Sequence, residues 1–275
     1  MTEATLPPVI GAAMPISALP AYREWLIEGS RDLEIQDFFS AEVLNGDWRG
    51  LVAEAKRQLR GHRGLLGIHG PFWGFSLATN DPDVRQVVVR RMDQGLDACA
   101  ALEATQMVVH SPYTTWDYYN LDNYPDGRQR LIELVHASLG AAVRRAERLG
   151  VTLVLENIED KDPHARVELA RSFNSAHVRV SLDTGHAYYA HGATGAPAVD
   201  YYVVAAGDML EHVHIQDADG YADRHWVPGE GTMRWHALFS ALGRLSSRPR
   251  LILEIRDKGR ILDGARFLAG LGLVR

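Results

Sequence analysis

The stretch from Leu210 to Gly231, LEHVHIQDADGYADRHWVPGEG, decides the fold. Its first six residues alternate as in a short buried strand, which places His212 and His214 on the same face. The strand runs into a polar loop in which Asp223 and His225 are two residues apart, so that an oxygen and a nitrogen donor can bind one metal ion. The pattern therefore predicts a metal site at the carboxyl end of a strand.

Strand and helix patterns alternate along the whole chain. The predicted strands cover residues 9–15, 33–38, 64–69, 107–110, 151–156, 178–183, 210–215 and 251–254. The predicted helices cover residues 18–28, 47–61, 82–103, 127–149, 164–173, 198–206, 235–245 and 262–271. Asp81-Pro82 and Leu149-Gly150 are typical of a helix start and a helix end. No linker interrupts the alternation, which predicts one domain over residues 1–275.

Eight strand–helix units in about 250 residues are typical of an α/β fold of the (β/α)₈ TIM-barrel type. An open, doubly wound sheet is the competing architecture. The barrel is favoured because six predicted strands carry a metal-type ligand at their carboxyl ends: His69, His110, Glu156, Asp183, His214 and Glu254. In a barrel these ends converge on one face, whereas an open sheet would spread them along a line. We therefore expect the active site at the carboxyl-terminal face of the strands.

Three further donors lie in adjacent loops. His186 follows Asp183 by three residues across a strand-to-helix turn, and Asp223 and His225 follow the seventh strand. A single His or Asp at a strand end is more often a hydrogen-bonded loop anchor, but six strand ends and three loop donors together indicate a metal centre. His214 is preferred to His212 as a ligand because it lies nearer the carboxyl end of its strand.

Composition narrows the class of protein. The 275 residues are 46% hydrophobic and 23% charged, which is ordinary for a globular domain. The formal net charge is −6 with scattered basic residues, which weighs against a nucleic-acid partner. Cys99 is the single cysteine, which excludes an internal disulfide. The chain has no apolar run of membrane-spanning length, and its N-terminal segment with Glu3 has no basic leader region, so we expect a cytoplasmic protein with no membrane partner.

The motifs at the strand ends resemble those of a known superfamily. They are IHGPF with His69, VVHSP with His110, LENIED with Glu156, SLDTGH with Asp183 and His186, HIQD with His214, DRHWVPGEG with Asp223 and His225, and LEIRD with Glu254. With them the chain resembles the xylose isomerase-like TIM barrels, which include sugar phosphate isomerases and epimerases and endonuclease IV (AP endonuclease family 2). The resemblance spans essentially the whole chain.

This resemblance implies a metal-dependent enzyme. The isomerase and epimerase members hold one divalent ion with four residues that match Glu156, Asp183, His214 and Glu254. The endonuclease IV branch holds three zinc ions with nine ligands, and all nine positions have a matching residue type here. On that pattern one ion takes His69, His110 and Glu156; a second shares Glu156 and adds Asp183, His214 and Glu254; a third takes His186, Asp223 and His225.

The full ligand set favours a multinuclear zinc or manganese phosphoesterase, because phosphoester hydrolysis uses several close metal ions. In this hypothesis a metal-bridging hydroxide attacks phosphorus, Glu156 and Glu254 anchor the ions, and Glu254 also orients or deprotonates the water. The alternative is a sugar or sugar-phosphate isomerase or epimerase with one ion, in which Glu156 and Glu254 transfer protons and His186 contacts substrate oxygens. A third possibility is a barrel without metal that only binds a ligand. Mixed His and carboxylate sites accept both zinc and manganese.

Aromatic residues near the strand ends predict the substrate. Phe72, Trp73, Tyr113, Trp116 and Trp226 are expected to line a wall for a sugar or polyol. The loop after the second strand, SAEVLNGDWRG, is short and acidic, unlike the DNA-inserting loop of an abasic-site endonuclease. We therefore expect a small phosphodiester of a sugar or polyol rather than duplex DNA. The family resemblance also makes a homo-oligomer an expectation.

Overall fold

Eight parallel strands paired in chain order close into a barrel in the computed structural model of the chain, which describes residues 6–275. They are β1 Ile10–Met14, β2 Leu33–Ile35, β3 Leu66–His69, β4 Gln106–His110, β5 Thr152–Glu156, β6 Val178–Asp183, β7 Leu210–Ile215 and β8 Arg250–Leu253. Pairing of β1 with β8 completes the barrel. The predicted TIM-barrel fold is confirmed.

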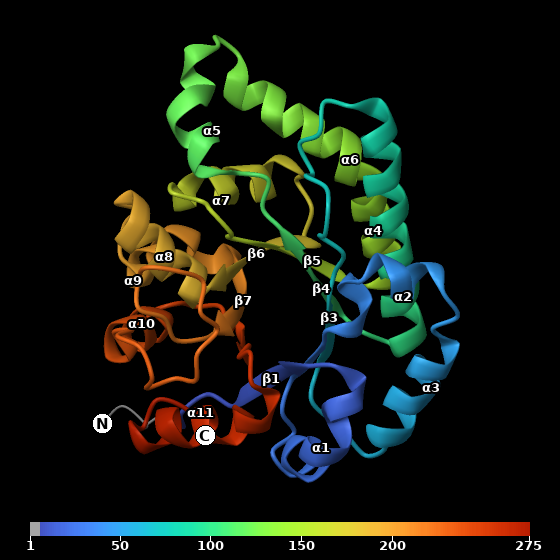
Figure 1. Cartoon of the computed structure of the whole chain (residues 1–275), viewed down its shortest axis with the longest axis vertical. Coiled ribbons are helices and arrows are strands. Elements are labelled where there is room, and N and C mark those ends of the chain that lie inside the picture. Colours follow the sequence, from blue (N-terminus) through green and yellow to red (C-terminus); the bar gives the residue numbers. More distant parts are fainter. Residues whose placement is uncertain (1–5) are drawn as a thin grey trace.

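Helices surround the barrel (Figure 1). They are α1 Leu19–Glu28, α2 Ala41–Asn45, α3 Arg49–Gln58, α4 Pro82–Leu102, α5 Thr115–Asn120, α6 Gly127–Leu149, α7 Pro163–Ser172, α8 Thr184–Thr194, α9 Val199–Ala206, α10 Trp235–Leu242 and α11 Ile261–Gly270. Short 3₁₀ turns are η1 Ile16–Ala18, η2 Asp37–Phe39, η3 Leu121–Asn123, η4 Gly207–Met209 and η5 Lys258–Arg260.

The helices α2, α5 and α8 are absent from the predicted ranges, and a side-chain cap precedes each of them. In α5 the Thr114 side chain accepts from Asp117 N–H, and the Asp117 carboxylate accepts from Thr114 N–H, which is a reciprocal cap. The Ser40 side chain caps α2 by accepting from Val43 N–H. The segments between the predicted elements therefore contain more helix than their apolar periodicity indicates.

Strand ends also differ from the prediction near the site. The second strand ends at Ile35 instead of residue 38, since the chain turns into η2, where the Asp37 carboxylate accepts from Ile16 N–H at 2.7 Å. Glu254 follows β8 instead of ending it. Both changes shorten the strands at the rim and leave polar residues free to enter the site.

The barrel core is apolar and continuous with the layer under the helices. In β5 the residues Leu153, Val154 and Leu155 are all fully buried. Because helices cover the outside of a parallel barrel, both strand faces are buried and such runs are apolar throughout. Each of these side chains contributes roughly 1.5–3 kcal/mol through burial. This rigid frame sets where the polar strand ends lie.

Helix ends follow the predicted chemistry. Asp81 caps α4 by accepting from Asp83 N–H at 2.8 Å, and Gly150 ends α6 with φ of 68°, which favours glycine. Asp183 caps α8 by accepting from His186 N–H at 2.7 Å. One carboxylate therefore joins the end of β6 to the start of α8 and sets the direction of His186.

The two ends of the described chain lie side by side, since Arg275 N–H donates to Pro8 O at 2.9 Å. Glu3, the acidic residue of the N-terminal segment expected to lack a leader, lies outside the described residues. Within residues 6–275, no helix combines the length and the hydropathy that crossing a membrane requires.

Candidate metal centre

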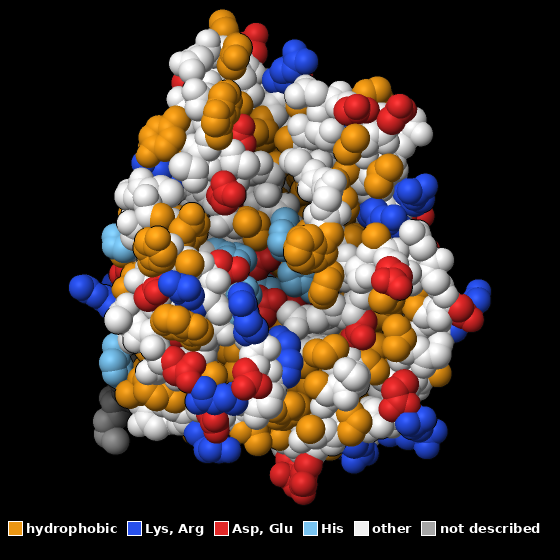
Figure 2. All heavy atoms as spheres, in the orientation of Figure 1, with side chains coloured by type: hydrophobic (Ala, Val, Ile, Leu, Met, Phe, Trp, Pro, Cys, Tyr) orange, Lys and Arg blue, Asp and Glu red, His pale blue; other side chains and the backbone are white. Residues whose placement is uncertain are grey.

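The predicted ligands meet at the carboxyl-terminal end of the barrel. Figure 2 shows histidine and acidic side chains at the bottom of a hollow in the centre of this face, with hydrophobic side chains around it. They form three adjoining groups in which the ligand atoms lie within 4.8 Å of one another, and Glu34, His212 and His214 form a fourth such group that shares His214 with them. We call Glu156, Asp183, His214 and Glu254 the central cluster; His69 and His110, which share Glu156, the histidine pair; and His186, Asp223 and His225 the loop cluster.

The central cluster is buried, with no member more than 7% exposed. His214 Nδ1 lies 3.2 Å from Glu254 Oε2 and 4.0 Å from Asp183 Oδ2, and it hydrogen-bonds to Glu156 Oε1. The other Glu156 oxygen, Oε2, is buried without a hydrogen-bond partner. Three carboxylates around one imidazole, with an unsatisfied oxygen, are a donor set that fits a divalent ion.

The electrostatics of the cluster also favour a cation. Burial disfavours the charged imidazole, but the carboxylates of Glu254, Glu34 and Glu156 hold the pKa of His214 well above its ordinary value. Burial opposes ionisation of Glu156, yet His214 outweighs it and the pKa of this carboxyl is lowered. The protonated His214 therefore supplies positive charge where a bound metal would supply it.

The histidine pair faces the unsatisfied oxygen. His69 Nε2 and His110 Nε2 lie 3.7 Å and 3.4 Å from Glu156 Oε2. His69 Nδ1–H donates to Gly70 O at 3.0 Å, which leaves its Nε2 lone pair free. Burial lowers the pKa of His110 to about 3, so this imidazole is neutral at physiological pH. Two imidazole nitrogens and one carboxylate oxygen can hold a metal ion.

The loop cluster lies on the other side of the centre. His186 Nε2 and His225 Nε2 lie 3.5 Å and 3.2 Å from the two oxygens of Asp223. Their Nδ1–H groups donate to the main-chain carbonyls of Asn157 at 2.9 Å and Glu254 at 3.0 Å. Such main-chain partners are typical of metal-binding histidines, because they direct the other nitrogen to the ion.

His225 is held in an unusual conformation. Its φ is 50°, in the left-handed region that non-glycine residues rarely adopt. The conformation is fixed from both sides, since His225 N–H donates to Gln216 Oε1 at 2.6 Å and its carbonyl accepts from Arg256 N–H at 2.9 Å. Backbone strain of this kind is found where a side chain must point at a site.

Gln216 joins the central and loop clusters. It is fully buried, and its amide Nε2 donates to both Asp183 oxygens at 3.0 and 3.1 Å and lies 3.2 Å from Asp223 Oδ1. A Cβ on Gly185 would lie 2.3 Å from this amide, so only glycine leaves room for it. The amide N–H groups therefore occupy the space between two carboxylates that a cation would otherwise share.

Three polar residues of the site were missed by the sequence analysis. Besides Gln216, they are Glu34 in β2, whose carboxylate contacts His214, and Gln36, whose Nε2 donates to Glu254 Oε1 at 2.6 Å. The available signal was an acid inside the apolar strand Leu33–Ile35, because a buried charge needs a partner. His212, expected deeper than His214, is buried, and its Nδ1 lies 2.8 Å from Ser181 Oγ.

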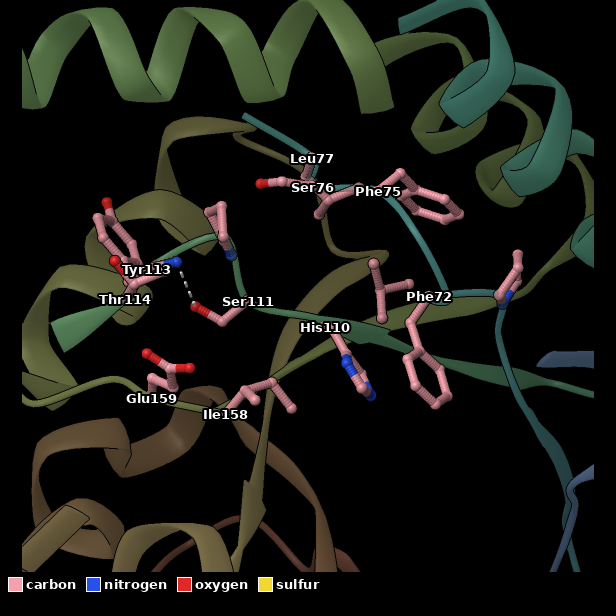
Figure 3. A pocket seen from close by; sticks show the side chains of 13 residues that line it. Phe72, Phe75, Ser76, Leu77, His110, Ser111, Tyr113, Thr114, Ile158 and Glu159 are labelled. Carbon is pink, nitrogen blue, oxygen red and sulfur yellow. Dashed lines mark hydrogen bonds between the residues drawn. The ribbon is translucent and has the colours of Figure 1, made fainter. Parts of the chain in front are cut away.

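A cavity of about 180 Å³ opens beside His110, and its lining includes Phe72 and Tyr113. Figure 3 shows Phe72 lying along His110; the two rings stack with centroids 4.0 Å apart. Tyr113 N–H donates to Ser111 Oγ at 3.3 Å at the other end of the cavity. The cavity is therefore walled by aromatic rings next to the histidine pair.

The other predicted aromatic residues lie elsewhere. Trp73 and Trp116 are 65% and 63% exposed and do not line this cavity. Trp226 pairs with Asp217 in an isolated bridge, and the Arg224 guanidinium lies 5.2 Å from its ring centroid. The structure therefore divides the predicted aromatic wall into two rings in the cavity and three outside it.

A closed barrel with clustered metal-type ligands at its carboxyl end defines a (β/α)₈-barrel enzyme with a candidate metal centre. The model of the family described as xylose isomerase-like TIM barrel matches residues 32–271. The chain belongs to this family.

Two curated relatives match parts of the chain. The uncharacterized protein MJ1311 of Methanocaldococcus jannaschii is 26% identical over 202 residues, which are 69% of this chain and 65% of that protein. The chain therefore spans about two thirds of this relative. Fructoselysine 3-epimerase of Escherichia coli O157:H7 is 50% identical over 38 residues, which are 14% of each chain.

Solved structures share the fold over nearly the whole chain. A D-tagatose 3-epimerase-like protein is 19% identical with a TM-score of 0.77, covering 95% of this chain and 96% of that one. The TTHB071 protein of Thermus thermophilus, solved after soaking with ZnCl₂, is 28% identical with a TM-score of 0.72, covering 95% and 97%. A D-psicose 3-epimerase and an L-ribulose 3-epimerase have the same fold at 18% and 17% identity.

The prediction that the protein is a phosphodiesterase is wrong. The solved relatives include a D-psicose 3-epimerase, an L-ribulose 3-epimerase and a D-tagatose 3-epimerase-like protein, and fructoselysine 3-epimerase shares a segment of 38 residues that is 50% identical to this chain. The expectation rested on the number of donors, which sets how many ions a site can hold but not which bond reacts. The alternative of an isomerase or epimerase is the better supported one.

Proposed function

We propose that the protein is a metal-dependent sugar epimerase or isomerase that moves a proton on the carbon next to the carbonyl group of a ketose. The observation that carries the proposal is the placement of two carboxylates, Glu156 from β5 and Glu254 after β8, in one buried cluster. Inversion at such a carbon needs one group to remove a proton and another to return a proton to the opposite face. Two carboxylates from different strands meet this requirement.

The central cluster fits one divalent ion, zinc or manganese. Its donors are one imidazole nitrogen and three carboxylates, and the Glu156 oxygen without a partner is the atom that an ion would satisfy. A bound ion would act as a Lewis acid that makes the proton next to the substrate carbonyl more acidic. Glu156, Asp183, His214 and Glu254 would hold it.

The chain orients the proton-transfer groups through neighbours. Gln36 Nε2 donates to Glu254 Oε1 at 2.6 Å, so the second oxygen, Oε2, is the one that faces His214. His186, which is 9% exposed, is available to contact a substrate oxygen. Phe72 and Tyr113 in the adjoining cavity would pack against the sugar, since ring faces bind the apolar faces of sugars.

Two comparisons support the proposal. The segment shared with fructoselysine 3-epimerase points to a ketose derivative, and a structural relative at 28% identity was soaked with zinc. The substrate we propose is therefore a small ketose, free or phosphorylated, and the cofactor is a divalent ion. The predicted homo-oligomer stays a prediction.

The flanking groups are proposed as accessory metal sites. The histidine pair and the loop cluster each offer donors within reach of one ion, so an excess of zinc would load up to three ions per chain. The central ion binds first, because its site has three carboxylates, whereas the histidine pair and the loop cluster have one each. Metal content by plasma mass spectrometry and anomalous scattering tests this order.

Proton transfer is tested directly in D₂O. Metal-loaded protein is incubated with a panel that includes D-tagatose, D-psicose, L-ribulose and fructoselysine, with a phosphate ester of each where one exists, and deuterium uptake next to the carbonyl is followed by NMR. We expect uptake with wild type and a loss of roughly 10²–10⁴-fold in Glu156→Gln and Glu254→Gln.

The matched control is Glu211→Gln. It removes a carboxylate on β7 that lies 3.0 Å from Arg179 Nε and is not part of the central cluster. It should keep wild-type uptake. A folded, metal-loaded wild type that exchanges none of these sugars would refute the proposed function.

A further inference from the structure

Glu34 is a buried carboxylate directly behind the central cluster. It lies in β2, is 2% exposed, and both of its oxygens lie 3.1 Å from His214 Nε2. Its Oε2 also lies 3.2 Å from His212 Nε2. A carboxylate in this position is costly to bury unless its partners need it.

His214 is oriented differently from three other histidines of the centre. His69, His186 and His225 donate Nδ1–H to main-chain carbonyls and turn Nε2 toward the ligand groups. His214 presents Nδ1 to the central cluster and Nε2 to Glu34. The imidazole is therefore reversed, and a side chain replaces the main-chain carbonyl as its partner.

This reversal has a chemical consequence. A neutral imidazole has one N–H group, and its other nitrogen carries the lone pair that binds a metal. An acceptor at Nε2 keeps the proton there and leaves the Nδ1 lone pair for the ion. A carboxylate is a stronger acceptor than a carbonyl and also makes the ligand nitrogen more basic.

Neighbours hold Glu34 in place. His212 Nδ1 lies 2.8 Å from Ser181 Oγ, and its Nε2 faces the Glu34 carboxylate, so one side chain packs between Ser181 and Glu34. Ser181, His212, Glu34 and His214 are all at most 2% exposed. The buried carboxylate thus faces the Nε2 atoms of both His212 and His214, and it has little freedom to turn.

We propose that Glu34 is a positioning residue that holds His214 with its proton on Nε2 and its Nδ1 lone pair toward the metal. The inference rests on the proposed metal at the central cluster. Glu34 touches neither the ion nor the substrate; it acts through His214.

The test compares Glu34→Ala and Glu34→Gln with the wild type by zinc titration against a chromophoric chelator. We expect Glu34→Ala to weaken the first zinc by roughly 10–100-fold. Glu34→Gln keeps the shape and an acceptor oxygen, so it should recover part of this loss. Ser138→Ala is the matched control, because Ser138 is equally buried but lies in α6 and belongs to none of the ligand groups; its zinc affinity should be unchanged.

A second readout separates positioning from general damage to the fold. In zinc-loaded protein with ¹⁵N-labelled histidine, the His214 Nε2–H signal should be present and protected from water exchange. It should lose this protection in Glu34→Ala while the Nδ1–H signals of His186 and His225 remain. Should Glu34→Ala not fold, Glu34→Gln takes its place in both measurements.

Two outcomes overturn the inference: a folded Glu34 variant that binds zinc as tightly as the wild type, or a His214 Nε2–H signal that stays protected without the carboxylate. Either result leaves the proposed function standing. A wild-type protein that binds no zinc at the central cluster would instead refute the proposed function.

Discussion

The central cluster and the loop cluster use similar donors but differ in what carries them. The central ligands lie on or next to strands β5 to β8 and are at most 7% exposed. In the loop cluster the Asp223 side chain is 43% exposed, and His225 adopts a left-handed φ. Strand pairing fixes the first set, whereas the second depends on a loop. The difference indicates that the central cluster has a fixed geometry, whereas the geometry of the loop cluster can change with its loop.

The largest expected effect is the difference between two single variants, each of which removes one imidazole from one cluster. His214→Ala should weaken the first zinc by more than the roughly 100-fold that loss of an outer partner causes, and abolish deuterium uptake. His225→Ala should leave the first zinc within about threefold of wild type, because His225 is not among the central ligands. Chelator competition measures both. Equal losses in the two variants would show that the clusters act as one site.

The pH dependence of the metal-free protein tests the charge of both clusters. Burial opposes protonation of His225, but Asp223, Glu254 and Asp183 raise its pKa from 6.5 to about 9, and carboxylates also raise the pKa of His186 and His214. A raised histidine pKa stabilises the folded state fully below 6.5, and this contribution is lost as the pH rises through the folded value.

We therefore expect the metal-free protein to lose stability between pH 6.5 and 9, on the order of 3 kcal/mol, since a pKa raised from 6.5 to about 9 corresponds to about 1.4 kcal/mol for each pH unit. Zinc should remove this loss, because the ion replaces the protons. Thermal melts with and without chelator measure it. A melting temperature that stays level or rises over this range in metal-free protein would contradict the assigned protonation.

A smaller effect is expected from the residue between the clusters. Gln216→Glu replaces the amide N–H groups that bond Asp183 and Asp223 but keeps an acceptor oxygen for His225 N–H, so the loop cluster should bind zinc about tenfold more tightly. Isothermal titration of protein already holding one zinc measures this second event. Gln216→Met is the control for volume, since it fills the space without donating hydrogen bonds. Unchanged second binding in both variants would mean that the amide does not compete with the ion.

The smallest expected effect concerns the aromatic wall. Phe72→Ala should raise KM roughly 2–10-fold with little change in kcat, because one ring contact is worth about 0.5–1.5 kcal/mol. Trp73→Ala should leave KM unchanged, as Trp73 is 65% exposed outside the cavity. Steady-state kinetics on the best ketose of the panel compares them. A larger effect at Trp73 would place the sugar on the outer rim.

The missed elements show the limits of local patterns. Helix α5 lies in a segment rich in Tyr, Asn and Asp, where the cap between Thr114 and Asp117 outweighs weak propensity. Glu34 is one acid in a short apolar strand, and neither periodicity nor spacing indicates the histidine that faces it. The count of donors likewise did not identify the reaction, since metal chemistry depends on which substrate bonds the ligands surround.

The sequence by itself determined the barrel and the set of candidate metal ligands, because strand periodicity, helix punctuation and polar strand ends are local properties of the chain. Only the tertiary structure decided which side chains face one another in the site and which of them are charged. Closure of β1 onto β8 brings Glu34 in β2 behind His214 in β7, 180 residues away, and reverses that imidazole relative to the others. Burial then sets the charge of each group, since desolvation and neighbouring charges depend on positions that only the closed barrel defines.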